Sequence, residues 1–297
     1  MLYITTSNGV YTYREKDGKL TLILKNRHSP GFFRKRAKGY FGICIHEPTN
    51  RLIVSSRERL GTANAGKITT DTALHIYDRR KMERGDYHEV FDVHDAHQIA
   101  SVEDLVFITD TGKNRVHVYD LAARKTTRLL NTGDKREDRN HVNAVYADRR
   151  QLLIGLNNSK LGDSEIIRLE ISALNSSERR EIDVYREGEI ISRTGLQHTH
   201  DIEPFGGGFL ACASSDGNLI SLDDGRILRH IGDWARGIAV GDRYIYVGTS
   251  GIANRKSRYV LKKSARVCVL DRRDFNLVDE INVPGAGQLN DLVFEKE

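Results

Sequence analysis

The feature that most constrains the fold of this chain is a pattern of apolar runs that recurs six times. Each copy opens with a short apolar strand, passes through a turn, and continues as a β-branched run that ends in small polar residues. The six copies are Gly42–Ile45 with Arg51–Ser56, Gln98–Ile99 with Leu105–Asp110, Ala144–Val145 with Leu152–Gly155, Asp201–Ile202 with Phe209–Cys212, Gly237–Val240 with Tyr244–Gly248, and Asp291–Phe294 with Met1–Thr6. Short runs bounded by Gly, Asn and Asp predict β-strands, and a fixed internal period predicts a repeat architecture.

Each copy is followed by a third strand of alternating character and by a fourth, more polar strand. For example, Val116–Tyr119 is followed by Thr126–Leu130, and Ile166–Leu169 is followed by Arg180–Val184. Four strands in a unit of about 50 residues are typical of propeller blades. We therefore expect an all-β fold, a six-bladed β-propeller with four strands per blade, that forms a single domain over residues 1–297.

The sixth copy is split between the two ends of the chain. Its first strand is Asp291–Phe294 and its second is Met1–Thr6. Pairing of these N- and C-terminal strands in one blade would close the ring and remove an exposed sheet edge. A β-sandwich is the alternative for a chain of many short strands, but six units in phase favour the propeller.

Composition excludes several classes of protein. With 46 Lys and Arg against 41 Asp and Glu, the net charge of +5 is too small to indicate a nucleic-acid partner. No run approaches the roughly 20 apolar residues of a membrane-spanning helix, and Met1–Thr6 does not resemble a secretory signal. The three cysteines, Cys44, Cys212 and Cys268, are too few and too far apart for a disulfide scaffold. A reducing, cytoplasmic location is expected, and the oligomeric state is not predicted.

The residues that open the first strand of each blade are expected to meet at one mouth of the central channel, because that strand lines the channel. The aligned positions are Phe41, His97, Asn143, His200, Arg236 and Asn290. Two residues before them stand Asp95, His141, His198, Trp234 and Gln288. This region, which also includes His94, holds five of the eleven histidines: His94, His97, His141, His198 and His200.

Convergent imidazoles indicate metal chemistry, because several of them bind a divalent ion and leave a coordination position open. We expect His97, His141 and His200 to ligate Zn, Fe or Mn. Asp95 and Asp201 would orient the imidazoles. For each histidine, the alternative is a hydrogen-bonded bridge between blades.

The remaining candidates divide between catalysis and substrate binding. Arg236 would stabilise negative charge on the substrate, and His198 or His94 would act as general acid or base. Six residues at the same mouth are candidates for binding a small anionic or sugar-like molecule: Asn143, Asn290, Asp110, Asn157, Trp234 and Tyr40.

Three longer segments, 27–40, 57–72 and 252–266, are expected at the same end. Two of them would form a positive collar, through Arg27, Arg34, Lys35, Arg36 and Lys38 in one and Arg255, Lys256, Arg258, Lys262, Lys263 and Arg266 in the other. This collar supports the alternative function, a non-catalytic propeller that binds a protein, glycan or nucleotide on a basic rim. Solvated loops explain the same residues equally well, and no nucleic-acid motif is present.

The strand–turn–strand unit Asp104–Asp120 resembles the repeats of NHL and gluconolactonase-like six-bladed propellers, and the resemblance extends over nearly the whole chain. Gluconolactonases hold a metal in the channel with an acidic residue and Asn or Asp ligands, a style that Asn143 and Asn290 match, although Phe41 stands where the acidic ligand is expected. Peptidyl-hydroxyglycine amidating lyases are also similar and place a His-ligated zinc near an arginine. The resemblance implies the six-bladed fold, and the expectation of a metal-dependent lyase or hydrolase depends on the histidine cluster itself.

The leading prediction is thus a metal-dependent enzyme with a His-rich site at the channel mouth. It would act on a small anionic or sugar-like substrate by hydrolysis or elimination, with oxygenation as an open alternative.

Overall fold

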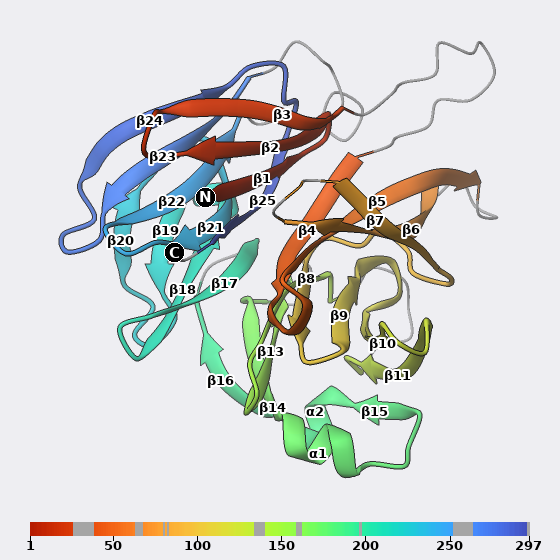
Figure 1. Ribbon diagram of the computed structural model, residues 1–297. Coiled ribbons are helices and arrows are strands. Elements are labelled where there is room, and N and C mark those ends of the chain that lie inside the picture. Colours follow the sequence, from red (N-terminus) through yellow and green to blue (C-terminus); the bar gives the residue numbers. More distant parts are fainter. Residues whose placement is uncertain are drawn as a thin grey trace.

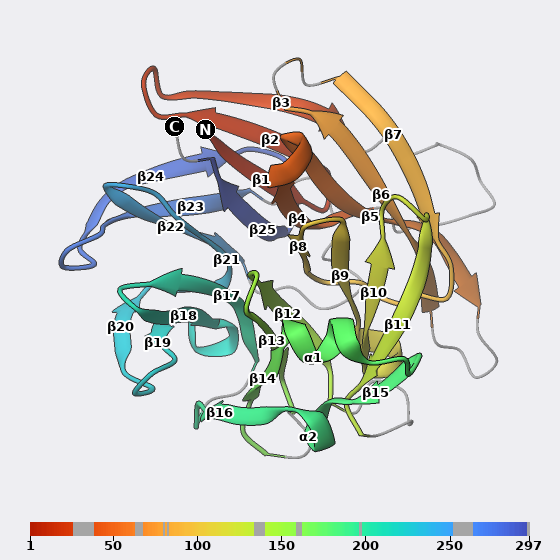
Figure 2. The ribbon, with the colours of Figure 1, turned by 60° about the horizontal axis from the view of Figure 1, so that its bottom comes forward.

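Six sheets, each built on four antiparallel strands, are arranged around a central axis in the computed structural model (Figure 1). The structure describes residues 1–25, 39–62, 68–79, 81, 83–133, 140–158, 162–195, 198–251 and 264–295. In Figure 2 the first strand of each sheet lies toward the middle and the fourth lies at the periphery. The prediction of a six-bladed β-propeller is confirmed.

The blades are numbered around the ring, and each is given from its innermost strand outward. Blade 1 is β25 (Leu289–Phe294), β1 (Leu2–Thr6), β2 (Gly9–Arg14) and β3 (Lys19–Lys25); blade 2 is β4 (Gly39–His46), β5 (Arg51–Thr62), β6 (Ile68–Asp78) and β7 (Glu83–Val90); blade 3 is β8 (Ile99–Val102), β9 (Leu105–Asp110), β10 (Arg115–Asp120) and β11 (Lys125–Asn131). Blade 4 is β12 (Val142–Ala147), β13 (Gln151–Leu156), β14 (Glu165–Glu170) and β16 (Glu189–Arg193); blade 5 is β17 (Thr199–Phe205), β18 (Gly208–Ala213), β19 (Asn218–Ser221) and β20 (Ile227–His230); blade 6 is β21 (Trp234–Val240), β22 (Tyr244–Ser250), β23 (Ala265–Asp271) and β24 (Leu277–Val283).

The core lies between neighbouring blades rather than inside any one of them. Phe107 of blade 3, for example, shares a cluster of buried side chains with Ile154 of blade 4. Inner strands are therefore buried on both faces, as in β9, where every residue after Leu105 is buried. Outer strands have solvent on one side, and most of β24 is exposed. This explains why the second strands read as continuous apolar runs and the fourth strands as polar ones.

The two ends of the chain close the ring in blade 1. Strand β1 pairs antiparallel with β25, with Leu2 opposite Phe294 and Ile4 opposite Leu292. The Glu295 amide also donates to the Met1 carbonyl at 2.8 Å, and the marked ends of the chain lie close together in Figure 1. The predicted closure is confirmed.

One expected strand lies in a different blade. The segment Arg180–Val184 was expected as the fourth strand of blade 4, but that strand is β16. Within the segment, β15 (Glu181–Asp183) instead pairs in parallel with β11 of blade 3, Leu129 opposite Glu181. The helices α1 (Ile171–Ser176) and α2 (Val184–Glu187) flank it. The Asp183 carboxylate accepts from the first amides of α2, which ends the strand there.

The described residues contain neither a disulfide nor a membrane-spanning helix. Cys44, Cys212 and Cys268 are all buried free thiols. Within the described ranges, no helix has the length and apolar character needed to cross a bilayer.

The inner strands of blades 2 and 3 touch at Gly42, and this contact gives a testable prediction. A Cβ on Gly42 would lie 2.5 Å from the Ile99 nitrogen, a backbone atom that has no room to move aside. We expect Gly42→Ala to lower the free energy of unfolding by about 3 kcal/mol, measured by urea denaturation. Gly85→Ala is the matched control, because a Cβ on Gly85 would lie an ordinary 3.5 Å from the Ile76 carbonyl oxygen. Equal stability of the two variants would contradict the packing.

Candidate functional site

Six side chains, one from each blade, line a common space at one mouth of the central channel. They are Phe41, His97, Asn143, His200, Arg236 and Asn290, the six aligned positions predicted from the sequence, and Gln98 and Asp201 lie next to them. We call these six residues the mouth ring. No water-sized space remains among the side chains. Residues distant along the chain are therefore brought into direct proximity.

Aromatic and imidazole rings form a continuous belt around this mouth. The His97 ring centroid lies 5.3 Å from that of His141 and 6.3 Å from that of His200. Trp234 lies 6.2 Å from His200 and 5.5 Å from His198. Four of the five histidines nominated from the sequence thus lie close together.

His97 and His200 are held in the same way in blades 3 and 5. The Nδ1 of His97 lies 2.9 Å from the Asp95 carbonyl and 2.8 Å from Thr111 Oγ1. The Nδ1 of His200 lies 2.9 Å from the His198 carbonyl and 2.8 Å from Ser214 Oγ. Arg57 Nη2, which can only donate, also lies 3.3 Å from His97 Nδ1. The two shorter contacts of His97 Nδ1 favour a proton on that atom, because a carbonyl only accepts and Thr111 Oγ1 donates its own proton to the Val142 carbonyl. The same carbonyl contact places the proton on Nδ1 of His200, so Nε2 carries the lone pair in both rings. Thr111 and Ser214 open equivalent turns, η2 (Thr111–Lys113) and η3 (Ser214–Asp216).

Both imidazoles are neutral. Burial lowers the pKa of His97 and of His200 well below the ordinary value, and the positive charges of Arg57 and Arg236 act in the same direction. Each ring therefore keeps an Nε2 lone pair that can accept a proton or a hydrogen bond at neutral pH.

Two buried arginines give the mouth positive charge. Arg236, 4% exposed, donates through Nη2 to His200 Nε2 at 2.7 Å. Arg57 of β5 lies with its guanidinium 3.6 Å from the Phe41 ring centroid and 3.3 Å from Asp95 Oδ1. Arg57 is not among the site residues predicted from the sequence. It belongs to the second strand of its blade, and it reaches the mouth because the pairing of β4 and β5 places it opposite Gly39, two residues before Phe41.

Two amide side chains and an indole at the mouth carry buried polar atoms that have no hydrogen-bond partner among the described residues. Both the Oδ1 and the Nδ2 of Asn143 are in this state, as are Asn290 Oδ1 and Trp234 Nε1. Asn290 Nδ2 donates to the Tyr40 carbonyl at 2.7 Å, which fixes Oδ1 as the outward atom. Unpartnered buried polar atoms cost about 1–3 kcal/mol each, so these atoms lower the stability of the fold.

His198 is held in the opposite tautomer by Asn157. Asn157 Nδ2 lies 2.9 Å from His198 Nδ1, and Asn157 Oδ1 accepts from the His198 amide at 2.8 Å. The second contact fixes which end of the amide faces Nδ1, so Nδ1 accepts and Nε2 carries the proton. Asn157, expected to contact substrate, is instead a buried positioning residue for His198.

Three other predicted site residues lie elsewhere. Asp110 is fully buried, where its carboxylate accepts from Arg115 Nε at 2.9 Å and from the His94 amide at 2.9 Å. It anchors loops within blade 3 and cannot reach the rim. His94 Nε2 lies 3.6 Å from Asp92 Oδ1, so its ring faces that carboxylate and not the belt of rings.

Tyr40 is the third of these residues. Neighbouring residues of a strand point to opposite sides, and Phe41 lines the channel. The Tyr40 ring therefore packs away from it, 5.8 Å from the His75 centroid in blade 2. Only the Tyr40 carbonyl reaches the mouth ring, through Asn290 Nδ2.

A second ring, directly below the first, alternates polar and small residues. Blades 1, 3 and 5 contribute Asp291, Gln98 and Asp201, whereas blades 2, 4 and 6 contribute Gly42, Ala144 and Gly237. Each polar side chain accepts from a main-chain amide of the next blade: Asp291 from Ile43 at 3.0 Å, Gln98 from Val145 at 2.9 Å, and Asp201 from Gly237 at 2.7 Å.

This second ring closes the channel below the mouth. Gln98 Nε2 also donates to Asp201 Oδ1 at 3.0 Å, which links two of the polar members directly. Asp201 was expected to orient an imidazole, but its oxygens are occupied by Gln98 and by the Gly237 amide. Strand periodicity alone does not predict these members, because consecutive residues of a strand point to opposite sides. Register shifts at these positions in the first strands of blades 1, 2, 4, 5 and 6 interrupt that alternation.

The second ring makes stability depend on pH. Burial raises the pKa of Asp201 to about 6, partly offset by the Gly237 amide and Arg236. The folded state therefore binds a proton more tightly than the unfolded state, and stability is lost as pH rises from about 4 to 6. We expect Asp201→Asn to gain about 3 kcal/mol relative to the wild type between pH 4 and pH 7. Urea denaturation at both pH values measures this, and a difference that does not change with pH would contradict it.

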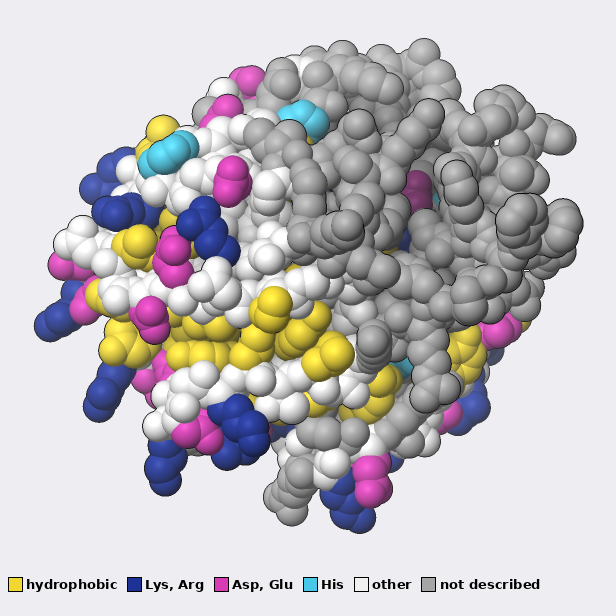
Figure 3. All heavy atoms as spheres, turned by 90° about the horizontal axis from the view of Figure 1, so that it is seen from above, with side chains coloured by type: hydrophobic (Ala, Val, Ile, Leu, Met, Phe, Trp, Pro, Cys, Tyr) yellow, Lys and Arg dark blue, Asp and Glu magenta, His cyan; other side chains and the backbone are white. Residues whose placement is uncertain are grey.

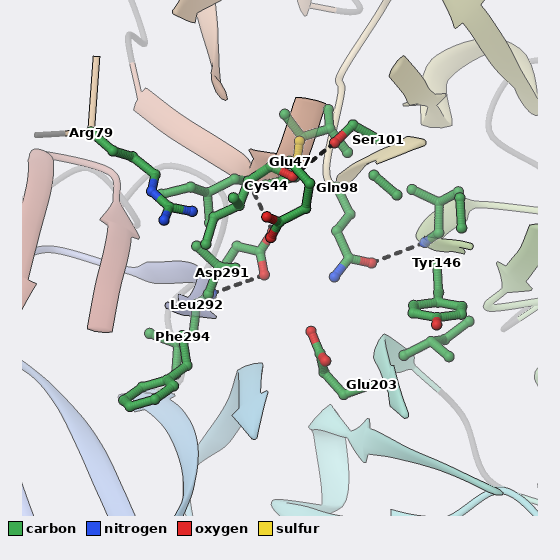
Figure 4. A pocket seen from close by; sticks show the side chains of 18 residues that line it. Cys44, Glu47, Arg79, Gln98, Ser101, Tyr146, Glu203, Asp291, Leu292 and Phe294 are labelled. Atoms are coloured by element: carbon green, nitrogen blue, oxygen red, sulfur yellow. Dashed lines mark hydrogen bonds between the residues drawn. The ribbon is translucent and has the colours of Figure 1, made fainter. Parts of the chain in front are cut away.

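A separate cavity of about 410 Å³ lies on the other side of the second ring (Figure 4). Gln98 lines both spaces. Glu203, Asp291 and Tyr146 line this lower cavity, and apolar side chains of the first strands form much of its wall. The channel is thus divided into two compartments, and the nominated histidines belong to the upper one.

The metal ligands predicted from the sequence fit a metal only in part. The carbonyl-anchored Nδ1 atoms of His97 and His200 leave Nε2 as the coordinating atom, as metal-binding histidines require. However, Arg236 occupies His200 Nε2, and a second guanidinium lies nearby. In the part of the chain that the structure describes, no group of three or more His, Cys, Asp or Glu is arranged to hold a metal ion.

Most of the predicted basic collar lies outside the described residues, including Arg27, Arg34–Arg36, Lys38, Arg255–Arg258 and Lys262–Lys263. Arg266, the described member, pairs with Glu280 at 3.0 Å and with Asp233 at 3.3 Å. Figure 3 shows lysine and arginine mixed with acidic side chains along the described edge of the molecule.

Comparisons with known proteins identify the class of protein and no more. No protein-family model matches the chain, and no curated protein matches it. A chain in the crystal structure of a nidogen/laminin complex is similar, with a TM-score of 0.63 and 11% identity over 98% of this chain and 97% of that one. At this identity the likeness shows the six-bladed propeller fold alone. In all, 539 chains of solved structures match this one.

Proposed function

We propose that the channel mouth is the active site of an enzyme that binds a small anionic substrate and catalyses hydrolysis or elimination on it. The observation that carries the proposal is the position of Arg236, a buried guanidinium beside neutral imidazoles. An anionic group would replace His200 Nε2 as the acceptor of Arg236, with the gain of a charge-assisted hydrogen bond.

The two tautomers at the mouth support acid–base chemistry. His97 Nε2 carries a lone pair and would accept a proton from a substrate hydroxyl or from water. His198 Nε2 carries a proton and would donate it to a leaving group. Arg57 and Arg236 would stabilise the negative charge that develops between them. Neutral acid and base groups held by separate partners are the arrangement that such reactions need.

The test is calorimetric titration of the purified protein with a panel of small anions, followed by product analysis. The panel contains acetate, inorganic phosphate, D-glucuronate and D-glucose 6-phosphate, with the neutral polyol glucitol as a control. Binding of an anion, conversion of it, and no binding of glucitol are expected. A protein that binds none of the anions would contradict the proposal.

A metal-dependent form of this activity is the second candidate. The carbonyl-anchored Nδ1 atoms favour it, because His97, His141 and His200 would present Nε2 atoms as ligands for Zn, Fe or Mn. Elemental analysis of anaerobically purified wild type and of His97→Ala tests it. Stoichiometric metal in the wild type and none in the variant would favour the metal over the anion alone.

The remaining alternative is a non-catalytic propeller that binds a protein, glycan or nucleotide on its basic rim. Arg266, the member of that rim that the structure describes, already pairs with Glu280. Kinship with NHL and gluconolactonase-like propellers is likewise a proposal, supported by the strand–turn–strand unit Asp104–Asp120.

A further inference from the structure

We infer that the lower cavity is a second binding site of the protein and that its ligand is a small organic ammonium ion with an apolar body. The inference concerns the compartment below the second ring, so it is independent of the activity proposed for the channel mouth. Unlike the space within the mouth ring, this cavity has room for a ligand. Its volume of about 410 Å³ lies within the range of small-molecule sites.

The wall of the lower cavity is suited to an apolar ligand body. The first strands of blades 1 to 5 each contribute apolar lining residues, among them Leu292, Ile45, Ile99, Val145 and Ile202. Burial of an apolar group against such a wall is favourable, because it removes the group from water. Glu47 also lines the cavity and is exposed, so the cavity opens to solvent beside it.

Carboxylates give the lower cavity its charge. Glu203 and Asp291 line it together with Glu47, and Figure 4 shows the Glu203 carboxylate directed into the space. Burial raises the pKa of Asp291 well above its ordinary value, and the charges of Asp201 and Glu203 act in the same direction. The negative charge of Glu203 therefore acts within the cavity, where a ligand cation would relieve the repulsion between the acids.

The basic side chain at the cavity is already paired. Among the described residues that line the cavity, Arg79 is the one with a permanent positive charge, and its Nη2 donates to Glu295 Oε1 at 2.7 Å. The Tyr146 hydroxyl likewise donates to Asp148 Oδ2 at 3.2 Å. An anionic ligand would meet carboxylates here, whereas a cationic ligand would meet its counter-charge.

An organic cation fits these residues better than a bare metal ion. The described chain arranges no three His, Cys, Asp or Glu around a common metal position. A primary ammonium group can instead pair with a single carboxylate, to which it donates a charge-assisted hydrogen bond. The aromatic rings of Tyr146 and Phe294 also line the cavity, and aromatic faces attract organic cations.

The test compares two ligands of the same size by calorimetric titration of the wild-type protein at neutral pH. Benzylammonium carries the charge, and benzyl alcohol is its neutral counterpart with the same apolar body. We expect benzylammonium to bind about 10-fold or more tightly, the gain of a hydrogen bond between charged groups. Equal binding of the two ligands, or binding of neither, would overturn the inference.

Glu203→Gln supplies the second arm, because it removes the charge and keeps the shape of the side chain. It should weaken benzylammonium about 10-fold and leave benzyl alcohol within about 2-fold of the wild type. Glu178→Gln is the matched control, since Glu178 is exposed and does not line the cavity, and it should change neither affinity. Benzylammonium bound equally by the wild type and Glu203→Gln would overturn the inference.

An anomalous X-ray difference map locates the site without any variant. Wild-type crystals soaked in 4-bromobenzylammonium should show a bromine peak inside the lower cavity, with the ammonium group toward Glu203. A bromine peak only at other positions would overturn the inference. This measurement decides the matter even where Glu203→Gln does not fold.

Discussion

Replacing Arg236 with alanine should weaken binding of the anionic ligand at least about 100-fold, a loss of about 3 kcal/mol. The guanidinium is buried, and its Nη2 lies 2.7 Å from His200 Nε2, so an anion that displaces the imidazole gains a hydrogen bond to a charged donor. Calorimetric titration with the best-binding panel anion measures the effect.

Two controls separate the role of Arg236 from simple loss of charge. Arg236→Lys keeps the charge but removes the planar set of donors, and should recover only part of the affinity. Arg266→Ala removes an arginine that pairs with Glu280 and Asp233 on the surface, and should change affinity less than about 2-fold. Equal losses in Arg236→Ala and Arg266→Ala would place the anion elsewhere.

Replacing His97 with alanine should lower the turnover number about 100- to 10,000-fold, the range expected for a general base. Burial and the neighbouring charges hold the pKa of His97 well below its usual range, so its Nε2 accepts a proton throughout the neutral range. Activity carried by this base should therefore persist below pH 6. The measurement is the pH–rate profile on whichever panel anion the wild type converts.

The dissociation constant provides the control for His97. A base that acts mainly on the reaction should leave binding within about 10-fold of the wild type. His230→Ala is the matched histidine variant, because His230 lies at the outer strand of blade 5 beside Asn218, and it should retain full activity. A His97→Ala protein with undiminished turnover would remove His97 from the chemistry.

Much of the fold follows from the sequence because each blade repeats the same burial. Inner strands such as β9 are covered on both faces by neighbouring blades, so they read as unbroken apolar runs, and the split sixth unit predicts closure by β1 and β25. No comparable sequence pattern indicates that β15 pairs with β11 of blade 3 rather than with a strand of blade 4. Glu181–Asp183 alternates as any edge strand does, and only the burial of Ile182 in the core between blades 3 and 4 distinguishes its true partner.

The mouth ring was predictable for the same reason, because aligned strands place aligned residues around one axis. The roles of individual side chains were not, since they depend on partners from other blades. Asn157 holds His198, Asp110 holds Arg115, and Arg57 reaches the mouth from a second strand. Tyr40 illustrates a second reason why side-chain roles are hard to predict. Its neighbour Phe41 lines the channel, whereas the Tyr40 ring packs against His75 on the other side of the strand.

The central claim is that the mouth ring binds an oxyanion through Arg236, and an anomalous X-ray difference map of crystals soaked in selenate tests it most directly. We expect a selenium peak within hydrogen-bonding reach of the Arg236 guanidinium and beside Asn143, and no such peak in crystals of Arg236→Ala. Selenate bound only at surface positions in the wild type, with the Arg236 guanidinium still on His200, would contradict it.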